Sequence, residues 1–227
     1  MTAQTGTLPP EGVRRMFDRI APVYDGMNRA MTAGLDRRWR DATAAAVVRP
    51  GDRVLDVCCG TGDLAIAAAK AGGKVTGLDF SQRMLARARE KKSDIEWVVG
   101  DALRLPFPDG SFDAATVGFG VRNLDDLERG LAELKRVLEP GARLGILEIT
   151  RPEGLLAPFY RLWFDGVIPL AGRVLPGGSA YAYLPASVRR FPAPEDLAKL
   201  LDEAGFDEIR WRLFAGGIVA LHTGTAR

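Results

Sequence analysis

The hydrophobic positions of residues 53–150 follow two alternating periods. Short apolar runs typical of buried strands are separated by stretches in which apolar residues recur every three to four positions, as in helices. The expected strands are Arg53–Val57, Lys74–Phe80, Ile95–Val99, Phe112–Phe119 and Arg143–Thr150. The expected helices are Asp63–Ala71, Ser81–Lys92 and Asp125–Glu139. Such alternation predicts parallel βαβ units with right-handed crossovers, so a ligand site is expected at the carboxyl ends of the strands.

The flanking segments complete this fold. Residues 1–12 are predicted to be a flexible arm, and helical spacing then runs from Val13 to about Ala21. Residues 24–28 are expected to connect this helix to a second helical stretch, which runs through Trp39 to Val48. After the middle of the chain the core pattern resumes with a helix, Pro194–Ala204, and two strands, Glu208–Phe214 and Gly217–His222. We therefore predict an α/β fold with a Rossmann-like, doubly wound and mostly parallel seven-stranded sheet, closed by a terminal antiparallel hairpin. Residues 13–227 are expected to form one domain, with an N-terminal helical block at 13–50.

Residues 151–193 interrupt the alternation. They are apolar and aromatic and are broken by prolines and glycines. A parallel sheet does not need about forty such residues between its elements, and insertions of this length are usually functional. We predict a helical cap insertion over the carboxyl edge of the sheet.

A glycine turn, Asp56-Val-Cys-Cys-Gly-Thr-Gly62, follows the first predicted strand. Gly60, Gly62 and Ala65 satisfy the dinucleotide pattern G-x-G-x-x-G/A. A pyrophosphate favours the positive end of a helix, yet Asp56 precedes this turn and Asp63 follows it. Two carboxylates disfavour a phosphate and favour a cationic ligand. S-adenosylmethionine, which carries an ammonium and a sulfonium but no phosphate, is therefore the first hypothesis for the ligand.

Acids also stand at the ends of the next two strands. Asp79 lies roughly 20 residues past the glycine turn, where a carboxylate can accept both ribose hydroxyls of an adenosine; it can also serve the helix that follows. Asp101 can take the adenine amino group while Ala102 leaves room for the flat ring, although a lone aspartate here is also typical of an Asx turn.

The fourth strand leads into Gly118-Phe-Gly-Val-Arg-Asn123. Glycines beside a ligand cleft allow close approach of the backbone, and Arg122 is placed to enter the site. A capping role for Asn123 at the next helix is the alternative interpretation.

Composition narrows the class of protein. A net charge of +2 gives no nucleic-acid footprint, and the single histidine and two adjacent cysteines predict neither a metal site nor a disulfide. No apolar run approaches the roughly 18 residues of a membrane-spanning helix. Cys58, Cys59, His222 and the four tryptophans are interpreted as packing residues. The arginines near the N-terminus are interpreted as a solvated face that can favour an anionic membrane surface: Arg14, Arg15, Arg19, Arg37, Arg38 and Arg40.

The glycine turn, with Asp79 and Asp101-Ala102, resembles that of the class I S-adenosylmethionine-dependent methyltransferases. A more specific block, Tyr24-Asp-Gly-Met-Asn-Arg-Ala-Met-Thr-Ala-Gly-Leu-Asp-Arg-Arg-Trp39, resembles the N-terminal signature of the ubiquinone/menaquinone biosynthesis C-methyltransferases. Phe119–Asn123 and Arg136–Thr150 resemble the later signatures of that family. The family usually has serine, histidine, glycine and serine where this chain has Thr32, Asp36, Ala142 and Thr150. At position 36 an acid therefore replaces a proton carrier.

The resemblance implies that a methyl group moves from S-adenosylmethionine to a ring carbon of a polyprenylated demethylmenaquinol, giving menaquinol. The enzyme must align carbon, methyl and sulfur and stabilise the developing phenolate. We expect Arg122 to be the catalytic residue, and Tyr24, Asn28 and Asn123 to line the substrate side. The expected cofactor-binding residues are Asp56, Gly60, Thr61, Gly62, Asp79, Asp101, Ala102 and Gly118. The expected location is the cytoplasm, with peripheral contact at the inner face of the cell membrane, and a homodimer is compatible with the sequence.

Other functions stay open at this point. Within the family, the substrate could be the benzoquinol precursor of ubiquinone, and another small-molecule methyltransferase is a further alternative. A nucleotide-dependent oxidoreductase is disfavoured by Asp56 and Asp63. A non-catalytic protein that retained the cofactor pocket is the remaining alternative.

Overall fold

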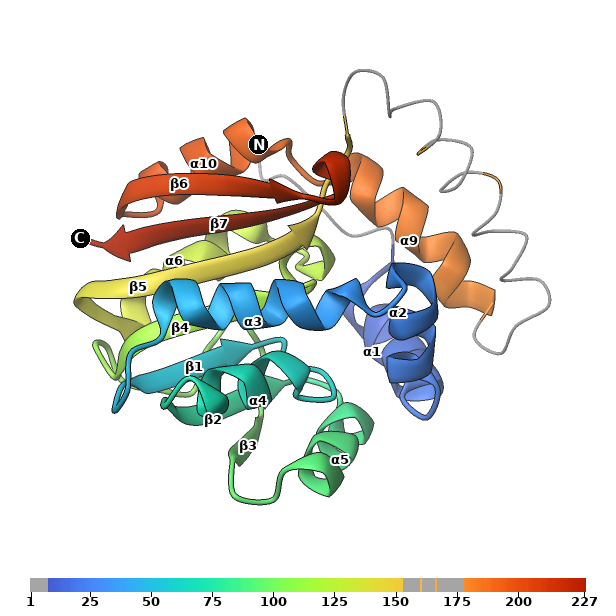
Figure 1. Cartoon of the computed structure of the whole chain (residues 1–227), viewed down its shortest axis with the longest axis horizontal. Helices are drawn as coiled ribbons and strands as arrows, with labels where there is room; N and C mark the ends of the chain where they lie inside the picture. The colour runs from blue at the N-terminus through green and yellow to red at the C-terminus, as the bar shows by residue number, and fades with distance from the viewer. Residues whose placement is uncertain (1–7, 153–159, 161–165, 167–177) are drawn as a thin grey trace.

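The computed structural model describes residues 8–152, 160, 166 and 178–227, and its centre is a seven-stranded sheet of order β3-β2-β1-β4-β5-β7-β6 (Figure 1). Its strands are β1 (Arg53–Val57), β2 (Lys74–Asp79), β3 (Glu96–Val99), β4 (Phe112–Gly118), β5 (Leu138–Ile149), β6 (Phe206–Phe214) and β7 (Val219–Ala226). The pairs from β3 to β5 are parallel. Strand β7 is antiparallel to both β5 and β6. The predicted mostly parallel sheet with a terminal antiparallel hairpin is confirmed.

Helices cover both faces of this sheet. Helices α3 (Leu35–Val47), α4 (Asp63–Lys70) and α5 (Gln82–Lys91) pack on one face, and α6 (Leu127–Val137) and α10 (Pro194–Glu203) pack on the other. Successive side chains of a strand point to opposite faces. Accordingly Val54 of β1 joins the core under α3, α4 and α5, whereas Leu55 joins the core under α6 and α10. Two apolar cores on one sheet are the doubly wound arrangement that the sequence predicts.

Local side-chain chemistry sets the ends of several helices. The Ser81 Oγ accepts a hydrogen bond from the Met84 N–H (3.1 Å) and caps α5, so the predicted helix starts one residue later, at Gln82. Asp126 caps α6 in the same way, through the Arg129 N–H (3.0 Å). Gly205, with φ +97°, follows α10 and takes a left-handed conformation that favours glycine.

The N-terminal block differs from the prediction. Helix α1 (Pro10–Ile20) begins three residues before Val13, because a proline fits the first helical position. Residues 24–28, expected to connect two helices, instead begin α2 (Tyr24–Thr32). Ala33 and Gly34 then adopt positive φ, and this break separates α2 from α3. The second predicted helical stretch is therefore two helices.

The last strands are longer than expected. Strand β5 begins at Leu138, which pairs with Phe112, rather than at Arg143. Strand β7 continues past His222 to Ala226. Trp39 and Trp97 are buried as predicted, and Trp163 lies outside the described residues. Trp211 is 42% exposed, because β6 is an edge strand.

Helix α9 (Gly178–Arg190) belongs to the predicted cap, of which residues 153–159, 161–165 and 167–177 lie outside the described residues. Helices α1, α2 and α9 gather beyond the carboxyl ends of the parallel strands (Figure 1). Two short 3-10 turns, η1 (Val121–Asn123) and η4 (Ala215–Gly217), follow β4 and β6. Across the described ranges, each helix is too short or too polar to cross a bilayer.

Candidate active site

Two adjoining cavities lie at the carboxyl edge of the sheet. The first, of about 280 Å³, contains the glycine turn and the ends of β2, β3 and β4, and we call it the turn cavity. The second, of about 320 Å³, lies among α1, α2, α3 and α9, and we call it the apolar cavity because methionine and aromatic side chains dominate its wall. Phe17, Tyr24 and Phe119 line both cavities. These three side chains therefore lie between the two cavities, which adjoin one another there.

Asp79 organises the turn cavity. Its Oδ2 accepts a hydrogen bond from the Gly60 N–H (2.9 Å), and its Oδ1 accepts one from the Ser81 N–H (2.8 Å). Burial raises the pKa of Asp79 to about 6, because its effect is larger than that of the two backbone donors, which lower the pKa. Each carboxylate oxygen can accept a second hydrogen bond, so Asp79 can hold the turn and still receive ribose hydroxyls.

Four more of the expected cofactor residues line the turn cavity. Asp101 forms the Asx turn, since its Oδ1 accepts the Leu103 N–H at 2.9 Å, but its side chain also borders the cavity. Ala102 and Gly118 complete this wall. Gly60 has φ +56°, and a Cβ at that position would meet nothing within 4 Å, so the backbone faces open space.

The other three expected cofactor residues do not line either cavity. Asp56 is fully buried on the sheet face under α3 and α4, where it accepts a hydrogen bond from the Thr116 hydroxyl (2.8 Å), and burial raises its pKa to about 7. Thr61 donates to Asp25 Oδ1 (2.6 Å). Gly62 packs against Trp97, so closely that a Cβ would lie 2.4 Å from the ring. These three residues therefore support the shape of the glycine turn without lining the cavity.

The charge of the turn cavity fits a cationic ligand. Among the described residues its wall contains the acids Glu11, Asp79, Asp101 and Asp125 and one cation, Arg14. The guanidinium of Arg14 is itself 3.1 Å from Glu11. A net-acidic cavity with an acid at the end of β2 and another after β3 accommodates an adenosine that carries a sulfonium and an ammonium.

The cysteines of the turn are packing residues, as expected. Cys58 lines the turn cavity with φ +55°, and Cys59 lies behind it near Gly77. Burial raises the pKa of both thiols well above the ordinary value, so a reactive thiolate is disfavoured. Among the described residues, no group of three or more histidine, cysteine or acidic side chains is arranged to hold a metal ion.

Arg122 lies in the wall of the apolar cavity. Its Nη1 donates to the Phe119 carbonyl (2.5 Å) and to Glu148 Oε1 (2.7 Å). Burial lowers the pKa of Arg122, but the neighbouring charges of Glu148 and Tyr24 outweigh that effect and raise it above its usual value. Its buried Nε has no hydrogen-bond partner within the described part of the chain. A permanent cation therefore borders the cavity, and its Nε is a buried donor without a described partner there.

The expected substrate-side residues divide between the cavities. Tyr24 lies between the two, and Asn28 lines the apolar cavity. Asn123 lines the turn cavity instead, with its amide nitrogen 3.4 Å from the Phe119 carbonyl oxygen.

Sequence reasoning missed a second buried arginine in the apolar cavity. Arg40, which was assigned to a solvated face, is 6% exposed and forms an ion pair with the buried Asp36 one helical turn earlier. Arg40 also lies over the ring of Phe119, 5.4 Å from its centroid. The spacing of four residues between an acid and an arginine on one helix was the available signal.

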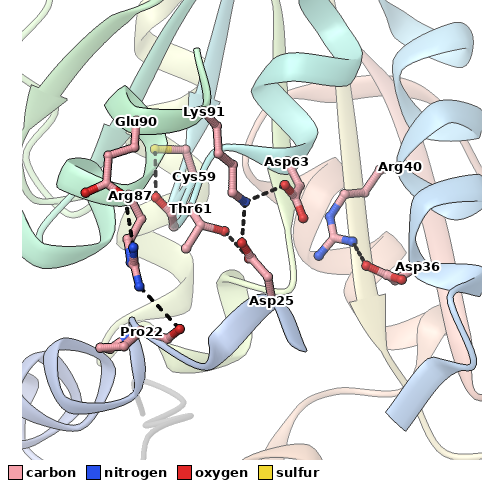
Figure 2. A network of polar contacts seen from close by, with 11 residues as sticks. Pro22, Asp25, Asp36, Arg40, Cys59, Thr61, Asp63, Arg87, Glu90 and Lys91 are labelled. Atoms are coloured by element: carbon pink, nitrogen blue, oxygen red, sulfur yellow. Dashed lines mark hydrogen bonds and ion pairs between the residues drawn. The ribbon is translucent and has the colours of Figure 1, made fainter. Parts of the chain in front are cut away.

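The N-terminal helices are tied to the glycine turn by charged contacts. Figure 2 shows the Lys91 Nζ between the carboxylates of Asp25 and Asp63, 2.6 Å from each. Asp25 belongs to α2, and its other oxygen receives the Thr61 hydroxyl. In α1, Asp18 receives the Ser81 hydroxyl (2.6 Å). These contacts place Phe17 and Tyr24 over the turn cavity.

The solved structures with a similar fold include methyltransferases and a cyclase. The chain superposes on a Thermotoga maritima S-adenosylmethionine-dependent methyltransferase with a TM-score of 0.65 and 24% identity, covering 94% of this chain and 99% of that one. It superposes on the 4+2 cyclase SpnF with a TM-score of 0.71 and 22% identity, covering 97% and 98%. At these identities the likeness shows the Rossmann-like methyltransferase fold.

Sequence relatives are more similar. The chain is 45% identical to a demethylmenaquinone methyltransferase of Thermus thermophilus, over 92% of this chain and 99% of that protein. It is 46% identical to a protein of that name from Deinococcus radiodurans, over 96% and 93%. It is 42% identical to a 2-phytyl-1,4-naphtoquinone methyltransferase of Synechococcus elongatus, over 94% and 97%. The model of the ubiE/COQ5 methyltransferase family matches residues 5–226, so the chain belongs to this family of S-adenosylmethionine-dependent methyltransferases.

Proposed function

We propose that the chain methylates a ring carbon of a polyprenylated demethylmenaquinol and so produces menaquinol. The observation that carries the proposal is the pair of cavities that share Phe17, Tyr24 and Phe119. One cavity has an acidic wall suited to S-adenosylmethionine, and the other has an apolar wall suited to a flat aromatic ring, with buried cations at its margin. The similar proteins named above support a naphthoquinol rather than a benzoquinol.

The residues of the turn cavity would bind the cofactor. Asp79 would accept the ribose hydroxyls, Asp101 the adenine amino group, and Gly60 and Gly118 would let the backbone approach closely. The bound cofactor supplies an electrophilic methyl group. The protein's own task is then to align a ring carbon with that methyl group and to exclude water from the path.

The apolar cavity would generate the nucleophile. Loss of a proton from a ring hydroxyl to water would make the adjacent carbon nucleophilic, and negative charge develops on that oxygen. After the methyl group is transferred, the hydrogen on that carbon would leave as a proton, which restores the aromatic ring. Arg122, buried and always protonated, would stabilise the phenolate through the positive charge of its guanidinium. Tyr24, at the junction of the cavities, would orient the same oxygen.

The test is methyl transfer from labelled S-adenosylmethionine to reduced demethylmenaquinone with a short prenyl tail, with the benzoquinol precursor of ubiquinone as the comparison. We expect labelled naphthoquinol product and at least tenfold slower transfer to the benzoquinol. Preferential methylation of the benzoquinol would place the chain in the ubiquinone branch. Binding of S-adenosylmethionine without transfer to either compound would contradict the proposal altogether.

We also propose peripheral contact with a membrane, through α2 and the start of α3. Val23 and Leu35 are 37% and 39% exposed, and Leu35 lines the apolar cavity. Exposed arginines lie on the same two helices: Arg29, Arg37 and Arg38. Such a basic and apolar surface is attracted to anionic lipid. Vesicles with anionic lipid should bind the protein more strongly than zwitterionic vesicles, and Leu35→Glu should weaken binding; equal binding to both vesicles would contradict this contact.

A further inference from the structure

Two buried arginines border one apolar cavity from different elements. Arg122 comes from η1 and Arg40 from α3, and both are 6% exposed. Each is paired with one buried carboxylate, Glu148 for Arg122 and Asp36 for Arg40. The proposed reaction uses one oxygen of the quinol and one arginine, so it leaves the second arginine without a role.

The Arg40 side chain keeps donors available. A guanidinium has five N–H donors, and within the described residues the hydrogen bonding of Arg40 is confined to Asp36. The other oxygen of Asp36 lies 3.0 Å from the Thr32 hydroxyl, which also lies 2.7 Å from the Asn28 carbonyl oxygen. Figure 2 shows the Arg40 guanidinium facing this carboxylate. The remaining N–H groups of Arg40 are thus oriented by a buried acid at the wall of a cavity.

Phe119 fixes the relation between the two arginines. Its carbonyl oxygen accepts from Arg122, and its ring lies under Arg40. The backbone of Phe119 is held by a hydrogen bond from its N–H to the Leu147 carbonyl (2.7 Å) and has φ +59°. A strained conformation of this kind persists only where the surrounding structure holds the residue in place. The two arginines that contact Phe119 are therefore held in fixed positions at the cavity.

A ring with two hydroxyl groups in para positions presents oxygens at opposite sides. We propose that Arg40, oriented by Asp36, donates a hydrogen bond to the second ring oxygen of the quinol, para to the one that Arg122 stabilises. Arg40 is then a specificity residue that selects para-dihydroxy rings over single phenols. This inference rests on the proposed function, because it concerns the substrate of the same site.

A purely structural ion pair is the competing explanation. A buried ion pair gives little net stability compared with apolar side chains of similar size, and the neighbouring wall of the cavity is apolar. The position of the pair at a cavity wall, with N–H groups left over, favours a ligand-binding role. The two explanations differ in one measurable respect: only the binding role depends on whether the substrate has a second hydroxyl.

The experiment compares two compounds that differ only in that hydroxyl: 2-prenyl-1,4-naphthoquinol and 3-prenyl-1-naphthol. Both retain the hydroxyl next to the free ring carbon. Wild type and Arg40→Met are assayed with each compound as a substrate, and the naphthol is also assayed as a competitive inhibitor, so that slow turnover still gives an affinity. The control is Arg49→Met, at an exposed arginine two residues after the end of α3.

We expect Arg40→Met to lower kcat/KM for the quinol about 10- to 100-fold, as for a lost hydrogen bond from a charged donor, and to change the values for the naphthol less than about threefold. Equal losses with both compounds would overturn the inference and leave the proposed function intact. A wild-type enzyme that does not methylate the quinol would overturn both. Unchanged affinity for S-adenosylmethionine shows that the variant is folded; if it is not, Arg40→Lys is compared in the same way.

Discussion

The Thr61 hydroxyl donates a hydrogen bond of 2.6 Å to the carboxylate of Asp25, across 36 positions of the chain. Thr61 lies within the glycine turn, and Asp25 lies in the first turn of α2. Lys91 reinforces this contact, since its ammonium bridges Asp25 and Asp63 (Figure 2). The N-terminal helices, which contribute Phe17 and Tyr24 to both cavities, are therefore attached directly to the turn that is proposed to bind the cofactor.

Asp25→Asn should weaken binding of S-adenosylmethionine about three- to tenfold. The variant loses an ion pair that is about three-quarters buried and weakens the attachment of α2, an effect on the order of 1 kcal/mol. Calorimetric titration of the free protein measures it, with Asp41→Asn, an exposed acid of α3, as the control. Unchanged affinity of Asp25→Asn would mean that the cofactor site does not depend on this attachment.

The spacing of apolar residues alone predicted β1, β2 and the doubly wound sheet, because this spacing depends only on residues that are near one another in the sequence. It missed helix α2, since Asp25 and Gly26 are poor helix formers. Contacts from Asp25 to Thr61 and Lys91, which are distant in sequence, provide stabilisation that propensity cannot show. Tertiary structure overrides local preference at this point.

The candidate site shows the same division. Motif spacing placed Asp79, Asp101 and Gly60 at one cavity, because strand ends meet at one edge of a parallel sheet. Alternation along the strand puts Asp56 on the opposite face from Leu55, but spacing could not show that this face lies away from the cavity. Nor could it separate Arg40 from its exposed neighbours on α3.

The affinity for S-adenosylmethionine should fall as the pH falls through about 6. Asp79 must be ionised to accept the ribose hydroxyls, and burial raises its pKa in the free protein to about 6. Below that pH the ligand must displace a proton, which costs about tenfold in affinity per pH unit. Titrations between pH 5 and 8 should show this slope, and Asp79→Asn should bind weakly at every pH. A pH-independent affinity in the wild type would contradict the ribose role.

The same shift has the opposite effect on stability. The pKa of Asp79 is about 6 in the folded protein and about 3.8 as its reference, so the folded state binds the proton more tightly. Its contribution to the free energy of unfolding therefore rises as the pH falls from about 7 to 4, by up to roughly 3 kcal/mol. Urea unfolding of wild type and Asp79→Asn across this range isolates the contribution, and parallel pH profiles would argue against a buried, ionised Asp79.

Glu148→Ala should destabilise the fold by about 3–5 kcal/mol. Glu148 is 1% exposed and is the acidic partner of Arg122, so its removal leaves a buried guanidinium uncompensated. The double variant Arg122→Met/Glu148→Ala should be more stable than Glu148→Ala alone, because the unpaired charge is gone. Denaturant unfolding of the four proteins forms a double-mutant cycle. Additive losses would mean that the two residues do not interact in the folded state.

Gly60→Ala and Gly62→Ala should differ sharply although they lie in the same turn. Both glycines have positive φ, so alanine costs about 1–2 kcal/mol at either position. At Gly60 the new Cβ meets nothing within 4 Å, whereas at Gly62 it would lie 2.4 Å from the Trp97 ring and 3.2 Å from Ala88. Overpacking of this kind adds about 1–3 kcal/mol. Thermal unfolding of the cofactor-free proteins should therefore rank Gly62→Ala below Gly60→Ala, and only Gly60→Ala should keep its fold while losing cofactor affinity. Equal melting temperatures would show that Trp97 can move away, and the turn would then be held by Asp79 rather than by its packing on β3.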